Sequence, residues 1–277
     1  MKKAQPGSIL LPEKARTYLD TLIRMVKKAA ADRIISILLF GSYAKGYADP
    51  EKSDLDLIIV LDDPVSQRRI DKVDRIAEGL ETTLGFSRPA KTRIERLFRA
   101  IERATGMFAS HFICRKGDIL RGDFKRVFSI SRTFGKILAP SKLVFNSVLS
   151  HVVTVFGDDI SSSIRRHDID IKQWLKSLLM CVLLSLSGFL AFLLDRKAGR
   201  FIREAAKWSL LNTYYYVNRR SPPFQKIIRA YSKKGLKTAE RLLSHSCGFN
   251  IISAIKSPFA VIKIHVKGLK LLENSDL

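Results

Sequence analysis

Two short apolar runs and the polar loop between them constrain this chain more than any other feature. The stretch LLFGSYAKGYADPEKSDLDLIIV, residues 38–60, leaves the first run at Gly41-Ser42 and enters the second at Asp54 and Asp56. Alternate residues of a strand lie on one face, so the two carboxylates are expected side by side where the second strand starts. Two acids beside an apolar strand are costly unless a cation neutralises them. Hard oxygen ligands of this kind suit Mg²⁺ or Mn²⁺.

The residues that precede the loop fit the same chemistry. Gly41 allows a tight turn and a close approach of the backbone to a ligand. Ser42 offers a hydroxyl and a backbone N–H to a phosphate at the start of a helical turn, where anions are favoured. Lys45, within the loop, is either a further phosphate contact or a solvated surface lysine.

Gly41-Ser42, eleven intervening residues and Asp54-Leu55-Asp56 resemble the signature of the nucleotidyltransferase superfamily, the polymerase-beta-like enzymes. The resemblance extends over residues 10–62. It implies that the Gly-Ser pair holds the triphosphate of a nucleoside triphosphate (NTP). It also implies that Asp54 and Asp56 bind the metals that activate the attacking hydroxyl and stabilise the leaving pyrophosphate. The alternative interpretation is a β-hairpin with a polar loop and a solvated pair of acids.

The third acid of the superfamily is where this sequence departs from the pattern. These enzymes commonly carry another carboxylate on the strand after the paired acids. The corresponding predicted strand, residues 107–114, has His111 as its one ionisable residue, and Asp118 follows in a turn. Three alternatives stay open: Asp118 completes the catalytic set, His111 replaces the acid, or the position is empty. An empty position would most affect proton removal from the attacking hydroxyl.

The apolar periodicity predicts an α/β (α+β) core with a small mixed sheet, followed by an all-helical C-terminal domain. We place the domains at residues 1–140 and 141–277, an arrangement that resembles kanamycin-type nucleotidyltransferases. Strands are predicted at 34–40, from Asp54 and at 107–114, and helices from Glu13, between 64 and 85, and over 91–104, 169–194, 199–216 and 222–231. Residues 250–267 are apolar with spaced lysines, and the pattern leaves helix or strand open there.

Residues 177–194 form a stretch of eighteen residues without a charge, which meets the lower limit for a membrane span. A central bundle helix buried all round explains the same stretch and is the favoured interpretation. A membrane-anchored protein is kept as the alternative.

The chain carries a formal net charge of +23, and the excess lies outside the motif. Residues 1–87 hold 14 basic and 13 acidic side chains, whereas residues 88–150 hold 14 and 4. A positive field of this size attracts polyanions, so RNA is the favoured partner and an anionic membrane the second. A generically basic proteome is the alternative explanation.

The 3 cysteines are scattered without a CxxC pair, which argues against structural zinc and a disulfide framework. They suit a reducing cytoplasm, and the N-terminus lacks the apolar run of a secretory signal, so a cytoplasmic location is expected.

Taken together, these features predict a Mg²⁺-dependent nucleotidyltransferase that transfers a nucleoside monophosphate from an NTP to an acceptor hydroxyl and releases pyrophosphate. An RNA end is the favoured acceptor. A protein hydroxyl and an aminoglycoside-like small molecule are the other acceptors considered. The alternative function is a catalytically weak or inactive module that binds a nucleotide or RNA.

Overall fold

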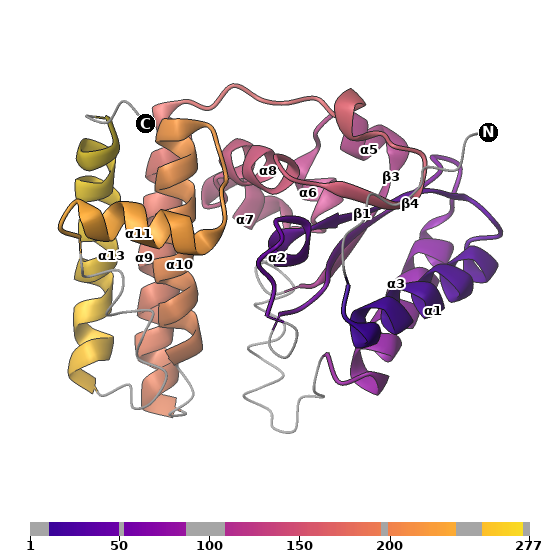
Figure 1. Ribbon diagram of the computed structural model, residues 1–277, viewed down its shortest axis with the longest axis horizontal. Helices are drawn as coiled ribbons and strands as arrows, with labels where there is room; N and C mark the ends of the chain where they lie inside the picture. The colour runs from indigo at the N-terminus through magenta and orange to yellow at the C-terminus, as the bar shows by residue number, and fades with distance from the viewer. Residues whose placement is uncertain (1–10, 50–52, 87–108, 195–198, 237–250, 274–277) are drawn as a thin grey trace. The chain divides into compact units, whose positions relative to one another are not determined.

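The computed structural model describes residues 11–49, 53–86, 109–194, 199–236 and 251–273. The chain divides into two compact units, which are described separately. The sheet unit comprises residues 1–135 and 151–167, and the helical unit comprises residues 136–150 and 168–277. Figure 1 shows the strands gathered in the first and the long helices in the second.

The sheet unit is built on a four-stranded mixed sheet with the strand order β3-β2-β1-β4. Strands β2 and β4 are both antiparallel to β1, and β3 runs parallel to β2. Its strands are β1 (Ile34–Phe40), β2 (Asp56–Leu61), β3 (His111–Arg115) and β4 (Val153–Gly157). A small mixed sheet, as predicted, is therefore the core of this unit.

Two amphipathic helices, α1 (Glu13–Ala29) and α3 (Gln67–Thr83), cover one face of this sheet (Figure 1). Their apolar sides form a single core with the strand residues that point toward them, which are Ile37 and Leu39 of β1, Leu57, Ile59 and Leu61 of β2, and Ile113 of β3. Because side chains alternate along a strand, Asp56 and Ile58 belong to the opposite face. The helix layer and the paired acids are thus on different sides of the sheet.

Short helices complete the sheet unit. They are α2 (Gly41–Ala44), α5 (Lys116–Leu120), α6 (Phe124–Val127) and the 3₁₀ turn Ser161–Ser163, and α7 (Arg132–Ile137) leads into the helical unit. Phe128, after α6, stacks edge-on against Phe112 of β3 with ring centroids 4.8 Å apart. Phe112 in turn lies 6.1 Å from Phe40 of β1, so aromatic rings cover part of the second face.

The helical unit contains α8 (Ser141–Leu149), α9 (Ile171–Leu194), α10 (Gly199–Asn218), α11 (Phe224–Lys233) and α13 (Ile251–Glu273). Helices α9, α10 and α13 pack against one another. A buried apolar cluster joins α10, α11 and α13 through Leu210, Tyr231 and Ile264. Gly188 of α9 allows the close approach of α10, because a Cβ there would lie 2.7 Å from Ile202 Cγ1.

Neutral polar groups lie inside this helical unit. The imidazole of His265 on α13 is fully buried and hydrogen-bonds Ser209 of α10. Its Nε2 is 3.3 Å from Ser177 Oγ of α9, which also accepts a hydrogen bond from Asn212 (2.8 Å). Ser185 and Ser257 form a second buried hydroxyl pair at 2.6 Å. These bonds fix the three helices against one another without any buried charge.

Several expectations are sharpened by the structure. Of residues 250–267, left open between helix and strand, 251–267 belong to the helix α13, and residue 250 lies outside the described residues. The third strand starts at His111 rather than at 107, and the predicted helix 91–104 lies outside the described residues. Strand β4 was missed, and its pairing with β1 places residues 151–167 in the sheet unit rather than in the predicted all-helical segment 141–277.

Helix α9 contains the uncharged stretch 177–194. Among the described residues, no helix is long and apolar enough to cross a membrane. Burial on all sides, however, is wrong: α9 packs on α10 and α13, while Leu175, Leu179 and Leu183 are 50%, 46% and 38% exposed. Their spacing of four residues places them on one outward stripe of the helix.

Candidate active site

The two halves of the Gly-Ser and DxD motif meet at one end of the sheet. Phe40, the last residue of β1, pairs with Asp56, the first residue of β2. Gly41 follows directly and has a φ of +71°, a conformation that side chains disfavour. A Cβ on Gly41 would overlap Asp56 Oδ2 and lie 2.8 Å from Asp56 Cγ. The glycine therefore lets the backbone that starts α2 pass directly against the Asp56 carboxylate.

Two hydrogen bonds between residues 49 and 53 close the second half of the loop between the strands. Asp49 N donates to Ser53 Oγ at 2.9 Å, and Ser53 N donates back to Asp49 O at 2.8 Å. Tyr43 of α2 is buried beneath this loop, and burial together with the charges of Asp49 and Asp54 raises the pKa of its hydroxyl. Asp54 is exposed and Asp56 half-buried. Both acids thus lie at the rim, where a cation can reach them.

Ser42 and Lys45 lie on the same short segment. Ser42 is half-buried within α2, and its carbonyl accepts a hydrogen bond from Tyr47 N at 3.1 Å. Lys45 caps the end of α2, and its charge, after burial, lowers the pKa of His151. The structure therefore brings Gly41, Ser42 and Lys45 to the end of β1 that pairs with Asp56.

His151 is a residue that the sequence analysis did not single out. It precedes β4 by two residues, and Val153 of β4 pairs with Leu39 of β1, next to the motif. Burial and the charge of Lys45 lower the pKa of His151 and thus favour its neutral imidazole, the form that can accept a proton. The sequence alone gives little reason to choose His151, because its place beside the motif depends on the pairing of β4 with β1.

His111 faces away from the paired acids. It is on the face of the sheet that α3 covers, where its Nδ1 is 2.6 Å from Glu81 Oε1 and its Nε2 is 3.2 Å from Asp74 Oδ1. Burial lowers the pKa of His111, but its bonds to Asp74 and Glu81 outweigh burial and raise it to about 9. The imidazole therefore ties β3 to α3, and the structure does not bring it to Asp56.

Asp118 lies at the other end of the sheet. Strand β3 is parallel to β2 and pairs Arg115 with Leu61, so Asp118, in α5, follows the end of β2 that is remote from Asp56. Asp56 and Leu61, the two ends of β2, are five residue steps apart, which is about 17 Å. The Asp118 carboxylate is buried and bonded to Arg121 at 2.8 Å and Arg126 at 3.1 Å. The structure does not bring it to the paired acids either.

An aromatic residue of β3, Phe112, lies on the face of the sheet that carries Asp56. Phe112 pairs with Ile58 of β2. It is buried against Phe40 and Phe128. Within the described residues, no group of three or more His, Cys, Asp or Glu side chains is arranged to hold a metal ion.

The two carboxylates that are present nevertheless suit Mg²⁺. This ion is commonly held by one or two carboxylates, with water and substrate phosphates completing the octahedron. Asp54 and Asp56 supply an all-oxygen pair beside the Gly41 turn. The residues therefore fit a magnesium–nucleotide complex better than a resident metal centre.

Comparison with known proteins finds a family that matches the part of the chain carrying the motif. Residues 19–103 match the family described as "Nucleotidyltransferase domain". This part of the chain is therefore similar to nucleotidyltransferase domains. The match includes α1 from Leu19 onward, β1, the loop with both halves of the motif, β2 and α3.

Two individual proteins extend the comparison. The chain is 44% identical over 54 residues to "Putative protein adenylyltransferase MJ1305" from Methanocaldococcus jannaschii, a stretch of 20% of this chain and 35% of that protein. The chain thus matches about a third of the length of this curated relative.

The fold is similar to that of spectinomycin adenyltransferase AAD(9) from Enterococcus faecialis, whose crystal structure contains ATP and spectinomycin. The TM-score is 0.53 with 9% sequence identity, over 92% of this chain and 99% of the other. This likeness extends the shared fold beyond the nucleotidyltransferase domain into the helical unit.

Proposed function

We propose that this protein is a Mg²⁺-dependent nucleotidyltransferase that attaches a nucleoside monophosphate to an acceptor hydroxyl and releases pyrophosphate. The observation that carries the proposal is the approach of Gly41 to the Asp56 carboxylate, and Asp54, two residues earlier in the chain, is exposed. Gly41 and Asp56 are fifteen positions apart in the sequence, yet they are in contact. The carboxylates of Asp56 and Asp54 give an anionic rim at this glycine turn. Such a rim is what a metal-bound triphosphate requires.

Each residue of the proposed site has a separate task. Asp54 and Asp56 hold Mg²⁺, which supplies a Lewis acid for the reacting phosphate. Gly41 and Ser42 present backbone and hydroxyl groups to the β- and γ-phosphates, and Lys45 offsets their charge. His151, neutral at pH 7, is the candidate for accepting the proton of the acceptor hydroxyl.

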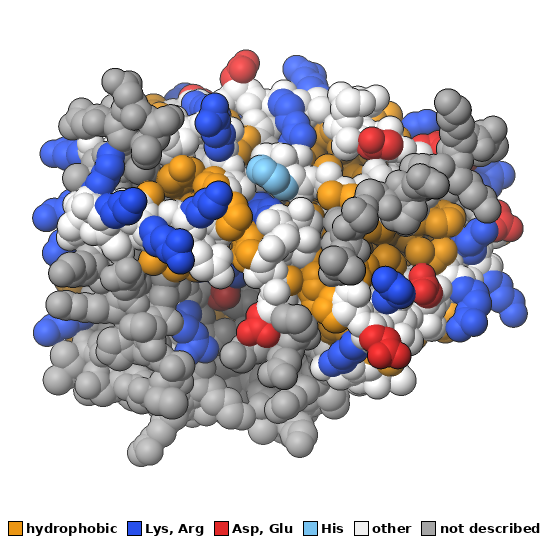
Figure 2. All heavy atoms as spheres, in the orientation of Figure 1, with side chains coloured by type: hydrophobic (Ala, Val, Ile, Leu, Met, Phe, Trp, Pro, Cys, Tyr) orange, Lys and Arg blue, Asp and Glu red, His pale blue; other side chains and the backbone are white. Residues whose placement is uncertain are grey.

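The proposed donor is ATP and the proposed acceptor is RNA. Both individual relatives have names that specify adenylyl transfer, which favours ATP over the other NTPs. The net charge of +23 favours a polyanionic acceptor, and Figure 2 shows Lys and Arg side chains spread over the visible face. A protein hydroxyl and an aminoglycoside-like small molecule are the competing acceptors, each suggested by one relative.

A catalytically weak or inactive nucleotide-binding module is the second candidate function. One observation favours it: Phe112 stands on the Asp56 face of β3, where related enzymes commonly carry their third acid. Such a module would bind an NTP with Mg²⁺ and leave it intact.

The proposal is tested by incubating the protein with Mg²⁺, total RNA and each labelled NTP in turn. Transfer of label from ATP to RNA is expected. It should fall by roughly a thousandfold in Asp54→Asn and Asp56→Asn, because each change removes a metal ligand. Asp20→Asn, an exposed carboxylate on α1, is the matched control and should keep full activity.

Two other outcomes are informative. Binding of ATP and Mg²⁺ without transfer to RNA, protein or aminoglycosides would reject the proposed nucleotidyltransferase activity in favour of the nucleotide-binding module. Transfer that persists in the Asp56→Asn variant would remove the proposed metal site. If transfer occurs, a further His151→Gln variant should lower kcat more than it raises KM, because its role is proton removal.

A further inference from the structure

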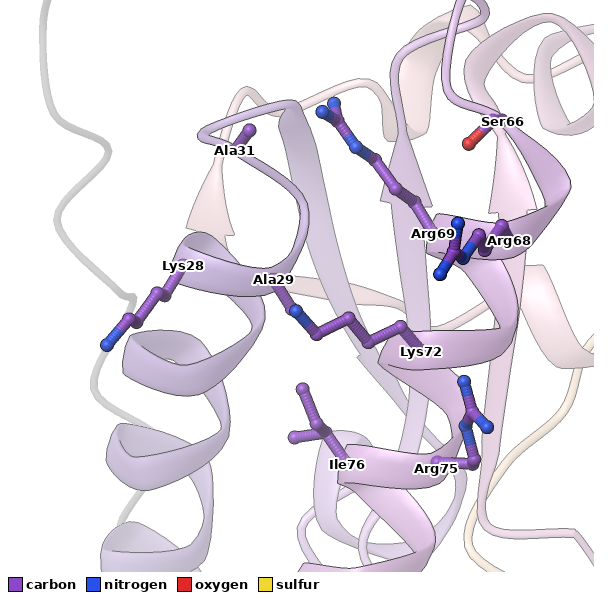
Figure 3. Close-up of a pocket in the computed structure, with 9 residues that line it drawn as sticks. All are labelled: Lys28, Ala29, Ala31, Ser66, Arg68, Arg69, Lys72, Arg75 and Ile76. Carbon is purple, nitrogen blue, oxygen red and sulfur yellow. The ribbon is translucent and has the colours of Figure 1, made fainter.

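A basic groove lies between the end of α1 and the start of α3 in the sheet unit. It has a volume of about 760 Å³ and includes five cationic side chains: Lys28 from α1, and Arg68, Arg69, Lys72 and Arg75 from α3. Figure 3 shows Lys72 reaching from α3 toward Ala29 and Arg69 reaching toward the turn at Ala31, while Lys28 points outward. Ser66, which precedes α3, lines the groove as well.

All five cationic side chains of this groove are exposed. None of the five cations forms an ion pair with any of the residues that the structure describes. On α3, Asp74 is bonded to His111, and Asp71 accepts a hydrogen bond from the neutral Gln67 amide at 2.9 Å. The N-terminus of α3, a helix of 17 residues, adds a further partial positive charge at the same place.

The groove is separate from the candidate active site. It lies where β1 begins and β2 has ended, since α1 leads into β1 and α3 follows β2. The motif residues lie at the opposite ends of both strands. Helices α1 and α3 also cover the face of the sheet that Asp56 does not occupy. A ligand of this groove is therefore not the nucleotide held at Asp54 and Asp56.

We propose that the groove binds the phosphodiester backbone of a single RNA strand. Arg68, Lys72 and Arg75 recur at intervals of four and three residues, so they form one row along α3. This row rises about 10 Å, enough for successive phosphates of an extended strand. Guanidinium groups pair with phosphate oxygens through two parallel hydrogen bonds, and three of the five cations are arginines.

The open form of the site also favours a strand over a compact anion. The four cations of α3 are all exposed and line a surface groove, and no described side chain closes over them. A backbone that passes through such a groove can continue beyond it in both directions. The choice of RNA rests on the proposed function, whereas binding in the groove needs no nucleotidyl transfer.

The test is the binding of a fluorescein-labelled oligouridylate to the full chain, followed by anisotropy over a series of salt concentrations. A variant with Arg68, Arg69, Lys72 and Arg75 each changed to Gln should bind at least tenfold more weakly at low salt. The slope of log K against log salt should become shallower by about 3, since each phosphate contact on a single strand contributes about 0.7. Circular dichroism should be unchanged, because all four side chains are exposed.

The matched control removes four charges from the helical unit. Lys226, Arg229, Lys233 and Lys263 are exposed as well, and changing them to Gln should alter affinity by less than the groove variant does. Equal losses in the two variants would mean general electrostatic attraction and would overturn the inference. Displacement of the oligouridylate by inorganic tripolyphosphate at equal phosphate concentration would also overturn it, because the groove would then hold a free polyphosphate.

A catalytically disabled variant separates this inference from the proposed function. Asp54→Asn/Asp56→Asn should bind the oligouridylate as tightly as the unaltered chain. If the unaltered chain transfers no label but loses RNA affinity in the groove variant, the proposed reaction fails and the groove stands. If transfer occurs and the groove variant binds normally, the groove inference fails alone.

Discussion

A buried histidine joins secondary-structure elements in each unit, and the two histidines differ in charge. In the sheet unit, Asp74 and Glu81 overcome the effect of burial on His111 and raise its pKa to about 9. In the helical unit, burial lowers the pKa of His265 to about 4, and the bond to the Val261 carbonyl opposes this only weakly. His111 is therefore an imidazolium at neutral pH, whereas His265 is a neutral imidazole.

The difference shows that the partners, rather than burial, decide the charge of a buried side chain. Burial lowers the pKa of both rings, but only His111 has carboxylates within hydrogen-bonding distance. His265 is surrounded by hydroxyl groups and a backbone carbonyl. The sheet unit thus uses charged pairs to position its parts, and the helical unit uses neutral hydrogen bonds that cost less to desolvate.

Two glycines give the largest expected contrast between the units. Gly41→Ala forces a Cβ into the Asp56 carboxylate and should reduce nucleotidyl transfer at least a hundredfold, because a metal ligand moves. Gly188→Ala forces a Cβ against Ile202 in the helical unit, and we expect a loss of about 1 to 3 kcal/mol in stability with little change in kcat. Transfer rates and urea unfolding of both variants measure the two effects.

Gly46→Ala is the control for backbone strain at Gly41. Gly46 has a φ of +70°, nearly that of Gly41, but no atom lies within 4 Å of the added Cβ. It should lose about 1 kcal/mol of stability and keep its activity. Equal loss of activity in Gly41→Ala and Gly46→Ala would show that strain, rather than contact with Asp56, disables the site.

Removal of each histidine is expected to have an intermediate effect. His111→Gln leaves the buried Glu81 without its cation, and we expect a loss of about 3 kcal/mol in the free energy of unfolding. His265→Gln removes neutral hydrogen bonds only and should cost about 1 to 2 kcal/mol. Urea unfolding gives both values. The double variant His111→Gln/Glu81→Gln should recover part of the first loss, and a full additive loss would argue against the ion pair.

The pH dependence of stability has the smallest expected effect. His111 has a raised pKa, so its stabilisation is complete below pH 6.5 and is lost as the pH rises through about 9. His265 has a lowered pKa, so its stabilisation is complete above pH 6.5 and is lost as the pH falls toward about 4. The differences between these pKa values and 6.5 correspond to at most about 3 kcal/mol on each side.

Urea midpoints between pH 4.5 and pH 9.5 test this assignment against the two Gln variants. His111→Gln should flatten the alkaline side of the profile, and His265→Gln should flatten the acid side. A His111→Gln variant with an unchanged alkaline side would contradict the charged state of His111.

The motif and its strands could be predicted from the sequence because they are local. The apolar runs around Gly41 and Asp56 mark two neighbouring strands, and the loop between them carries both halves of the motif. The positions of His111 and Asp118 could not be predicted, because they depend on the register of β3 against β2. A parallel pair whose strands are fifty residues apart leaves no local trace of that register.

Strand β4 and the exposed stripe of α9 were missed for a related reason. The segment VTVFG resembles the apolar helices around it, and only pairing with β1 makes it a strand. The stripe of α9 consists of apolar residues, as its buried sides do, so composition alone predicted burial all round. His151 and the basic groove depend on these same long-range placements, and neither was a candidate from the sequence.

The pairing of β1 with β4 has a consequence for how the protein is made. More than a hundred residues separate Leu39 from its partner Val153, and α7 and α8 lie between them in the chain. During synthesis, one edge of β1 remains unpaired until β4 has left the ribosome. Strand pairing across a loop of this length is also slow. A fragment that ends at residue 140 would keep every motif residue and lack that neighbour. Such a fragment would expose the edge of β1 and invite pairing between chains.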